Sequence, residues 1–242
     1  MSIAFFDIDG TLVPLPSLEK RFFSSLLLRG KIPPGNFLRW AARMVAPARA
    51  HLGTAPGSNK MYLRGIPASV LSEPALRPDR WLPEFFPAAL QRVRWHALRG
   101  EEIVLLTGTL APLADAVKAA LERELLWRGA PRRVAVIATR LLARNHCWTG
   151  STAGPAVFGE VKAAAASSLA ARRGIPLAGC FAYGDHPLDL GLLAAVGNPF
   201  AVNASPGLRR IALARGWPTL SWSRCPPQSS GHLPLSKGEA LP

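Results

Sequence analysis

The chain is poor in cysteine and has no long apolar run. Its 242 residues include three cysteines, Cys147, Cys180 and Cys225, which form no Cys-x-x-Cys pair. This spacing excludes a disulfide framework and a thiolate zinc site. No apolar run approaches the roughly 18 residues that a membrane span needs, and no basic stretch precedes the apolar residues at the N-terminus. We therefore expect a soluble, cytoplasmic protein.

Charged residues are also scarce, and few of the basic ones are lysine. Charged residues make up 18% of the chain and hydrophobic residues 49%, a balance that excludes global disorder. The formal net charge is +14, and only six of the 29 basic residues are lysines. Such a surface favours phosphorylated or other anionic partners. The basic residues are spread from Arg21 to Arg224, so we expect a generally basic surface and no nucleic-acid partner.

Short apolar runs that end at a polar residue predict buried parallel strands. They lie at residues 2–6, 103–106, 134–138 and 179–183. The segments between them have helical composition, and Leu113, Val117, Leu121 and Leu125 would share one helix face. This alternation predicts an α/β fold with a doubly wound parallel sheet.

The first two predicted strands are separated by roughly a hundred residues, far more than the dozen or so that a crossover needs. We therefore expect an inserted helical cap at residues 13–83 and a core made of residues 1–12 and 84–222. A small hairpin is expected over residues 140–149, with Asn145 near its turn. Residues 223–242 are rich in proline and serine, and we expect a disordered tail there.

Aspartate is scarce too, and its distribution is uneven. Four of the six aspartates, Asp7, Asp9, Asp185 and Asp189, fall in two short turns that directly follow apolar runs. The carboxyl ends of parallel strands meet at one edge of the sheet, so these four carboxylates would converge and repel one another unless a cation neutralised them. A site made of oxygen atoms suits Mg²⁺. An acidic helix cap and turn is the alternative interpretation of the first pair.

Two further motifs can hold phosphate oxygens. Thr107-Gly108-Thr109 follows the second predicted strand, and Lys162 stands at the start of a predicted helix that runs to Arg173. A hydroxyl beside backbone N–H groups and a lysine near a helix N-terminus are both suited to anions. Each motif alone is also typical of an ordinary turn or a solvated lysine. Their order after successive strands favours the phosphate-binding interpretation.

Taken together, the motifs Asp7-Ile8-Asp9-Gly10-Thr11, Thr107-Gly108-Thr109, Lys162 and Gly184-Asp185-His186-Pro187-Leu188-Asp189 resemble those of the haloacid dehalogenase superfamily of phosphohydrolases. The chain looks most like subfamily IB, whose phosphoserine phosphatase-like enzymes carry a helical cap of the C1 type after the first motif. The resemblance covers about residues 1–222. It implies a Rossmann-like core and Mg²⁺-dependent hydrolysis of a small soluble phosphate ester.

The resemblance also implies roles for individual residues. Asp7 would be the nucleophile that forms an aspartyl-phosphate, and Asp9 the general acid and base. Asp7, the main-chain carbonyl of Asp9, and Asp185 would bind Mg²⁺, while Asp189 would hold a metal-bound water or orient Lys162. The residues expected to shape the phosphate site or bind the phosphate are Gly10, Thr11, Thr107, Gly108 and Lys162.

The chain departs from the phosphoserine phosphatase pattern at two places. Pro16 stands where those enzymes carry the glutamate that recognises the substrate ammonium, so the resemblance does not extend to phosphoserine as the substrate. His186 follows Asp185 where a small residue is common, and it would either touch the substrate or serve the turn. The polar residues of the predicted cap that are suited to substrate contact are Arg21, Lys60, Tyr62 and Arg64.

Two alternatives to a phosphatase remain open at this stage. A phosphotransferase would use the same intermediate and pass it to an alcohol instead of water. A non-catalytic module would use the basic surface to bind an anion or a nucleic acid. The intact set of Asp7, Asp9, Lys162 and Asp185 favours an enzyme that acts on a small phosphorylated metabolite.

Overall fold

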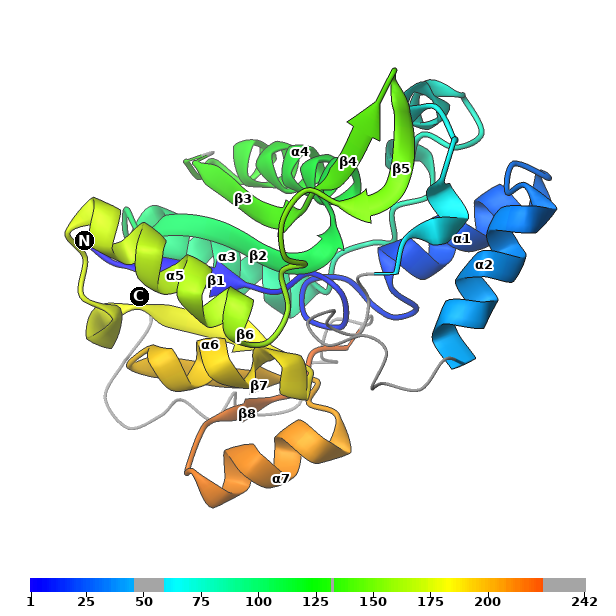
Figure 1. The fold of residues 1–242 in the computed structure, drawn as a ribbon. Helices are drawn as coiled ribbons and strands as arrows, with labels where there is room; N and C mark the ends of the chain where they lie inside the picture. Colours follow the sequence, from blue (N-terminus) through cyan, green and yellow to red (C-terminus); the bar gives the residue numbers. More distant parts are fainter. Residues whose placement is uncertain (46–58, 132, 224–242) are drawn as a thin grey trace.

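A six-stranded parallel sheet forms the centre of the molecule (Figure 1). The computed structural model describes residues 1–45, 59–131 and 133–223. The tail expected at residues 223–242 lies outside this range except for its first residue. The strand order is β3-β2-β1-β6-β7-β8, and every neighbouring pair is parallel. The strands are β1 (Ile3–Phe6), β2 (Glu102–Leu110), β3 (Val134–Thr139), β6 (Phe181–Gly184), β7 (Asn198–Val202) and β8 (Thr219–Leu220).

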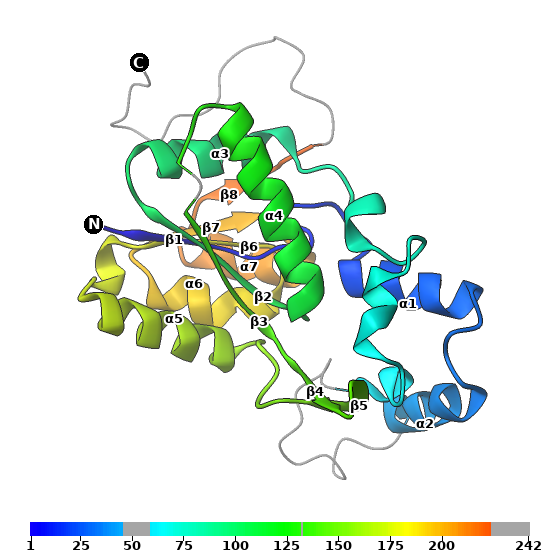
Figure 2. The same cartoon turned by 90° about the horizontal axis from the view of Figure 1, so that it is seen from above.

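Helices cover both faces of this sheet (Figure 2). Helices α3 (Pro87–Leu98) and α4 (Ala111–Trp127) lie on one face, and α5 (Glu160–Arg173), α6 (Leu190–Ala195) and α7 (Pro206–Ala214) on the other. Strand β1 shows the alternation that this requires: Phe6 packs in the cluster that includes α4, whereas Phe5 packs in the cluster that includes α5. The doubly wound parallel sheet predicted from the sequence is confirmed.

The four apolar residues predicted to share one face of helix α4 point into the core. Leu113, Val117, Leu121 and Leu125 are each at most 1% exposed. Proline in the first turn suits the start of this helix because no intrahelical partner is lost there. This stripe of apolar residues therefore fixes which face of α4 lies on the sheet.

Strand β2 is longer than predicted. It continues through Thr107-Gly108-Thr109 to Leu110, whereas the sequence placed these residues in a turn after the strand. The register with β3 shifts between Thr107 and Leu110. Thr107 pairs with Ala138, the residues after it lie in an irregular stretch of the strand, and pairing resumes between Leu110 and Thr139. The prediction missed this because a bulge leaves no periodic signal.

The chain makes an insertion between β1 and α3, and the described residues of this insertion lie beyond the carboxyl end of β1 (Figure 2). Its helices are α1 (Leu18–Leu28) and α2 (Pro34–Val45), followed by short 3₁₀ helices at Met61–Leu63, Ala68–Ser72 and Pro78–Arg80. Leu18, Phe22 and Leu26 lie at helical spacing on α1 and are fully buried. The two ends of the insertion meet where the Phe86 N–H donates to the Leu12 carbonyl at 3.0 Å.

A hairpin between β3 and α5 packs against this insertion. It consists of β4 (Leu141–Arg144) and β5 (Cys147–Thr152), with Asn145 and His146 at positive φ in the turn, as expected near Asn145. Trp148 of β5 accepts a hydrogen bond from Gly65 N–H at 2.7 Å and donates one to Ile66 O at 2.9 Å. Two segments about 80 residues apart in sequence are thereby joined through backbone hydrogen bonds.

Candidate active site

The site lies where β1 and β6 run side by side at the centre of the sheet. Strands β2 and β3 extend the sheet to one side of β1, and β6 to β8 extend it to the other, so the carboxyl ends of β1 and β6 flank the switch point of the fold. The Asp7 N–H donates to Tyr183 O at 3.0 Å and prolongs this pairing. Gly10 has a φ of 83°, and a Cβ there would lie 2.2 Å from Asp185 Oδ2. Glycine is therefore required where the two aspartate turns meet.

Lys162 joins three motifs that are far apart in sequence. Its Nζ lies 2.6 Å from Asp7 Oδ1 and 2.5 Å from Asp189 Oδ1, and all three residues are buried. Lys162 is in the first turn of α5, which starts after Gly159, and the Gly159 N–H donates to Leu188 O at 3.0 Å. Burial alone would lower the pKa of Lys162, but Asp189 and Asp7 together raise it. The lysine is therefore cationic at neutral pH.

Three carboxylates gather beside this lysine. Asp7, Asp185 and Asp189 each offer an oxygen within 4.8 Å of the others. Burial raises the pKa of Asp7 to about 7, and the neighbouring Asp189 adds to the effect while Lys162 opposes it. Burial and the charge of Asp7 likewise raise the pKa of Asp185 to about 8. One lysine does not neutralise this cluster, which could hold a metal ion.

His186 serves the turn in this structure. Its exposed side chain accepts a hydrogen bond from the Leu188 N–H through Nδ1, at 3.2 Å, and its own N–H donates to Asp189 Oδ2 at 3.1 Å. Asp189 therefore receives a donor on each oxygen, from Lys162 and from the His186 backbone. Of the two roles considered for His186, these contacts favour the turn.

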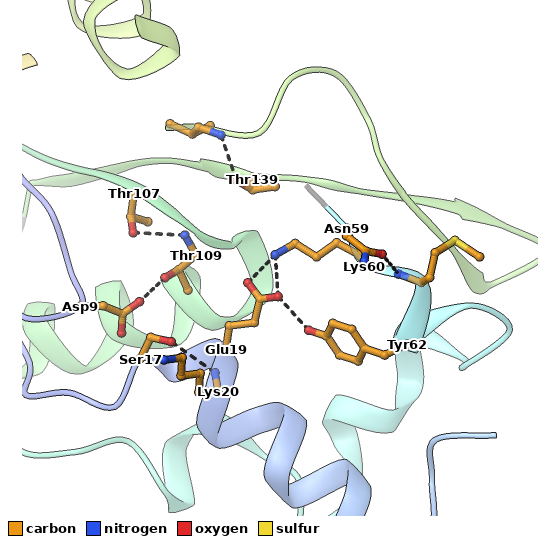
Figure 3. A network of polar contacts seen from close by, with 12 residues as sticks. Asp9, Ser17, Glu19, Lys20, Asn59, Lys60, Tyr62, Thr107, Thr109 and Thr139 are labelled. Carbon is orange, nitrogen blue, oxygen red and sulfur yellow. Dashed lines mark hydrogen bonds and ion pairs between the residues drawn. The ribbon is translucent and has the colours of Figure 1, made fainter. Parts of the chain in front are cut away.

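Asp9 lies two residues after Asp7, but its carboxylate contacts both the insertion and Thr109, and Figure 3 shows the second contact. The Leu18 N–H at the start of α1 donates to its Oδ1 at 2.8 Å, and the Thr109 hydroxyl donates to Oδ2 at 2.5 Å. Burial raises the pKa of Asp9. The sequence analysis did not assign a role to Thr109, although it quoted the motif that contains it.

The remaining residues predicted to bind phosphate lie around this centre. Thr107 is 1% exposed, and its hydroxyl accepts the Thr109 N–H at 3.2 Å (Figure 3). A Cβ on Gly108 would lie 1.8 Å from the ring of Phe158, so only glycine fits beneath this ring. Thr11 Oγ1 is buried and has no hydrogen-bond partner among the described residues.

The polar residues predicted for the cap divide into two groups. Lys60 Nζ lies 2.5 and 2.6 Å from the two carboxylate oxygens of Glu19, and the Tyr62 hydroxyl donates to Glu19 Oε1 at 2.9 Å (Figure 3). In contrast, Arg21 donates to the backbone carbonyls of Pro16 and Pro14, and Arg64 is exposed. The sequence analysis missed Glu19. The sequence offers one indication of its importance: Glu19 is the only acidic residue between Asp9 and Glu73.

Asn203 is a second residue that the sequence analysis missed. It follows β7 at a φ of 45°, donates through Nδ2 to Gly10 O at 3.0 Å and accepts the Trp222 N–H at 2.7 Å. A side chain from a third strand end thereby supports the Gly10 turn. A hollow of about 180 Å³ opens beside it, lined by Gly10, Leu15, Phe86, Asp185, Asn203 and Trp222.

A buried lysine held between aspartates at the switch point of a doubly wound sheet is typical of an α/β enzyme, and the three aspartates could hold a metal ion. Comparison with known proteins makes this class specific. The sequence pattern of the haloacid dehalogenase-like hydrolases matches residues 4–194, and the chain belongs to that family.

Relatives and solved structures agree with this assignment. A protein from Mycobacterium tuberculosis named a probable phosphatase is 30% identical over 98% of this chain and 81% of its own length. A structure of a protein of unknown function from Bordetella pertussis Tohama I is 26% identical, covers 90% of this chain and 97% of its own, and has a TM-score of 0.68. A phosphoserine phosphatase structure shares the fold at 17% identity, with a TM-score of 0.61 over 92% of this chain and 94% of its own. The protein is a phosphatase of the haloacid dehalogenase family.

The comparisons also decide between the enzyme and the non-catalytic alternative. The phosphatase relatives decide against the non-catalytic module that the sequence left open. In the part of the chain that the structure describes, no helix combines the length and apolar character needed to cross a membrane.

Proposed function

We propose that Asp7 attacks the phosphorus of a small soluble phosphate monoester and forms an aspartyl-phosphate. The observation that carries this proposal is the buried contact of 2.6 Å between Asp7 Oδ1 and Lys162 Nζ. Lys162 orients the carboxylate and places a fixed positive charge where negative charge is transferred during the attack. Asp189, 2.5 Å from the same nitrogen, holds the lysine in position.

Asp9 is suited to act as the general acid and base. The Leu18 N–H and the Thr109 hydroxyl orient its carboxyl group, and burial raises its pKa, which favours the protonated form that a general acid needs. Asp9 would give its proton to the leaving alcohol. It would then accept a proton from the water that hydrolyses the aspartyl-phosphate.

Mg²⁺ fits the donor set at this site. The carboxylates of Asp7 and Asp185 are hard oxygen ligands close to one another, and their raised pKa values reflect burial and a repulsion that a divalent cation would relieve. We assign the cation to Asp7, Asp185 and the main-chain carbonyl of Asp9. Asp189 already accepts two hydrogen bonds, so we assign it to positioning Lys162. When bound, the cation would cancel charge between the attacking carboxylate and the phosphate.

The phosphoryl oxygens would be held by Lys162 together with Thr107 and Gly108. Gly10 would shape the turn that lets Asp185 approach the end of β1. The Thr11 hydroxyl is buried and has no hydrogen-bond partner among the described residues, as expected of a group that binds the phosphate. Residues 13–83 would act as the cap over the core of residues 1–12 and 84–222, and the hairpin at 141–152 would be attached to that cap through Trp148.

A phosphotransferase remains the second candidate because it would use the same aspartyl-phosphate. The two differ only in the acceptor, and Asp9 can activate an alcohol as well as water. Product analysis with an added alcohol separates them: a phosphatase releases inorganic phosphate, and a transferase makes a new ester.

The test is hydrolysis of an aryl phosphate by the wild type and by Asp7→Asn, each with Mg²⁺ and with a chelator. We expect activity only in the wild type with Mg²⁺, and a loss of several orders of magnitude in Asp7→Asn. Asp115→Asn is the matched control because Asp115 is exposed on α4. Normal turnover by a folded Asp7→Asn protein would remove Asp7 as the nucleophile.

A further inference from the structure

The insertion contains a nearly buried ion pair that faces the proposed general acid. The Lys60 side chain is 2% exposed and contacts both oxygens of Glu19, whose side chain is 22% exposed. The Tyr62 hydroxyl adds a third hydrogen bond to the same carboxylate. Glu19 is therefore compensated in charge and well supplied with donors before any substrate arrives.

This pair lies next to the segment that holds Asp9. Glu19 directly follows Leu18, whose N–H holds Asp9, and the charge of Glu19 acts on the Asp9 carboxyl. In Figure 3 the Lys60 side chain extends toward Thr109, which donates to Asp9, and the Glu19 carboxylate lies beside the Lys60 ammonium. A general acid contacts the oxygen of the leaving alcohol, so the rest of that alcohol would extend from Asp9 toward the pair.

We propose that the Glu19–Lys60 pair makes the enzyme select phosphate esters whose leaving alcohol is uncharged and carries hydroxyl groups, such as a polyol or sugar phosphate. This inference rests on the proposed function of the site. A hydroxyl can donate to the Glu19 carboxylate and accept from the Lys60 ammonium while the pair stays intact. A charged leaving group meets repulsion at this pair, because Lys60 stands beside the Glu19 carboxylate that would attract an ammonium, and Glu19 stands beside the Lys60 ammonium that would attract a carboxylate.

The same contact disfavours an amino-acid ester such as phosphoserine. Its ammonium would have to displace Lys60 from Glu19, and its carboxylate would have to displace Glu19 from Lys60, although the two side chains are already 2.5 Å apart. The pair would have to separate inside a largely buried environment, where a charge left without its partner is costly.

The experiment compares kcat/KM for four esters of similar size: glycerol 1-phosphate, phosphoethanolamine, phosphoglycolate and phosphoserine. The wild type should prefer glycerol 1-phosphate by at least about tenfold, the effect of roughly 1.4 kcal/mol. Lys60→Met leaves the Glu19 charge unpaired and should shift the preference at least tenfold toward phosphoethanolamine. Glu19→Gln leaves the Lys60 charge unpaired and should shift it at least tenfold toward phosphoglycolate.

The opposite direction of these two shifts separates recognition from a merely structural role, which would change all four esters alike. Lys31→Met and Glu73→Gln are matched controls, because that pair, at 2.9 Å, lies in the same insertion and is about 40% exposed on both sides. Neither control should change the preference. Glu19→Gln preserves the shape and the acceptor for Tyr62, so it keeps the test decisive if Lys60→Met fails to fold.

Three outcomes overturn the inference while leaving the proposed function intact. The first is a wild type that cleaves the aryl phosphate but prefers a charged ester or phosphoserine. The second is a wild type that cleaves the aryl phosphate and none of the four esters. The third is a pair of variants with the wild-type preference, or with shifts in the same direction. An enzyme that cleaves no phosphate ester at all overturns the proposed function as well.

Discussion

The backbone N–H of Leu18 donates to Oδ1 of Asp9 at 2.8 Å, across a boundary between the insertion and the sheet edge. The first turn of α1 thereby positions a carboxyl group that the β1 turn supplies. Because Glu19 is the next residue, the segment that orients the proposed acid also carries the ion pair beside it. One peptide unit therefore connects the proposed general acid with the pair proposed to select the leaving group.

Thr109 supplies the other half of this positioning. Thr109→Val removes the hydroxyl that donates to Asp9 Oδ2 while nearly preserving the volume of the side chain. We expect kcat for an alkyl phosphate to fall about 10²-fold, because a misplaced acid no longer reaches the leaving oxygen. The loss should be smaller for an aryl phosphate, whose leaving group needs less protonation. Thr149→Val is the control, since the Thr149 hydroxyl donates to the Leu142 carbonyl and accepts the Ser151 N–H, both within the hairpin. Equal losses for both esters would contradict this role.

Lys162 is expected to matter for stability as well as for turnover. Lys162→Met leaves Asp7 and Asp189 buried without their cation, which costs about 3–5 kcal/mol when a buried pair is broken. We expect a markedly lower midpoint of urea unfolding without metal and partial recovery when Mg²⁺ is added. The half-exposed Lys118 on α4 is the control, and Lys118→Met should leave the midpoint unchanged. A metal-free Lys162→Met protein as stable as the wild type would contradict the buried contacts.

Several residues of the candidate site could be predicted from the sequence because they follow strands of one parallel sheet. Asp7, Thr107 and Asp185 each follow an apolar run, and parallel strands bring their carboxyl ends to one edge, so local patterns sufficed to place them together. Glu19 and Lys60 are 41 residues apart; Glu19 lies in the first turn of α1, and Lys60 directly precedes the 3₁₀ helix Met61–Leu63. No period connects them, so their pairing depends on tertiary packing that local patterns do not encode.

The same reason explains two other omissions. His96 received no role from the sequence, yet it is fully buried and contacts Tyr183, 87 residues away. The hairpin was predicted as a local unit, but its pairing with residues 65–68 joins segments far apart in sequence. Hydrogen bonds across such separations are set by how helices and loops pack on the sheet. The amino-acid composition around one residue of such a hydrogen bond does not indicate which distant residue it contacts.

Replacing Asp185 should have opposite effects on the stability of the metal-free protein and on its stabilisation by Mg²⁺. Burial raises the folded-state pKa of Asp185 from the ordinary 3.8 to about 8, so the unfolded state loses this proton first and stability falls as the pH rises between these values. Asp185→Asn should therefore raise the unfolding temperature of the metal-free protein at pH 8. Each kcal/mol gained corresponds to roughly 2–4 °C for a chain of this size. The variant should also lose the stabilisation that Mg²⁺ gives the wild type.

Calorimetric unfolding with and without Mg²⁺ checks both effects of Asp185→Asn. The exposed Asp115→Asn should respond to Mg²⁺ like the wild type. A variant that is destabilised without metal, or that still gains full stability from Mg²⁺, would show that Asp185 has another role.

His96 should give the fold a measurable pH dependence. Its Nδ1 pairs with the Glu101 carboxylate and its Nε2 lies 2.9 Å from the Tyr183 hydroxyl, so Nδ1 carries the proton in the neutral ring and Nε2 accepts. Burial lowers the pKa of His96 below 6.5; Glu101 opposes this effect, and Arg92 and Arg99 add to it. Burial alone would raise the pKa of Glu101, but hydrogen bonds from His96 and Arg99 lower it, so this carboxyl stays ionised near neutral pH.

As the pH falls below 6.5, the unfolded chain binds a proton at His96 and the folded protein does not, so stability decreases by up to about 1.4 kcal/mol per pH unit from this residue. His96→Gln keeps a donor for Glu101 and an acceptor for Tyr183 without this titration. We expect the loss of stability between pH 7.5 and pH 5.5, measured by urea unfolding, to be smaller in His96→Gln than in the wild type. His146→Asn, at the exposed hairpin turn, should keep the wild-type dependence. An unchanged pH dependence in His96→Gln would mean that the buried imidazole takes up its proton as readily when folded as when unfolded.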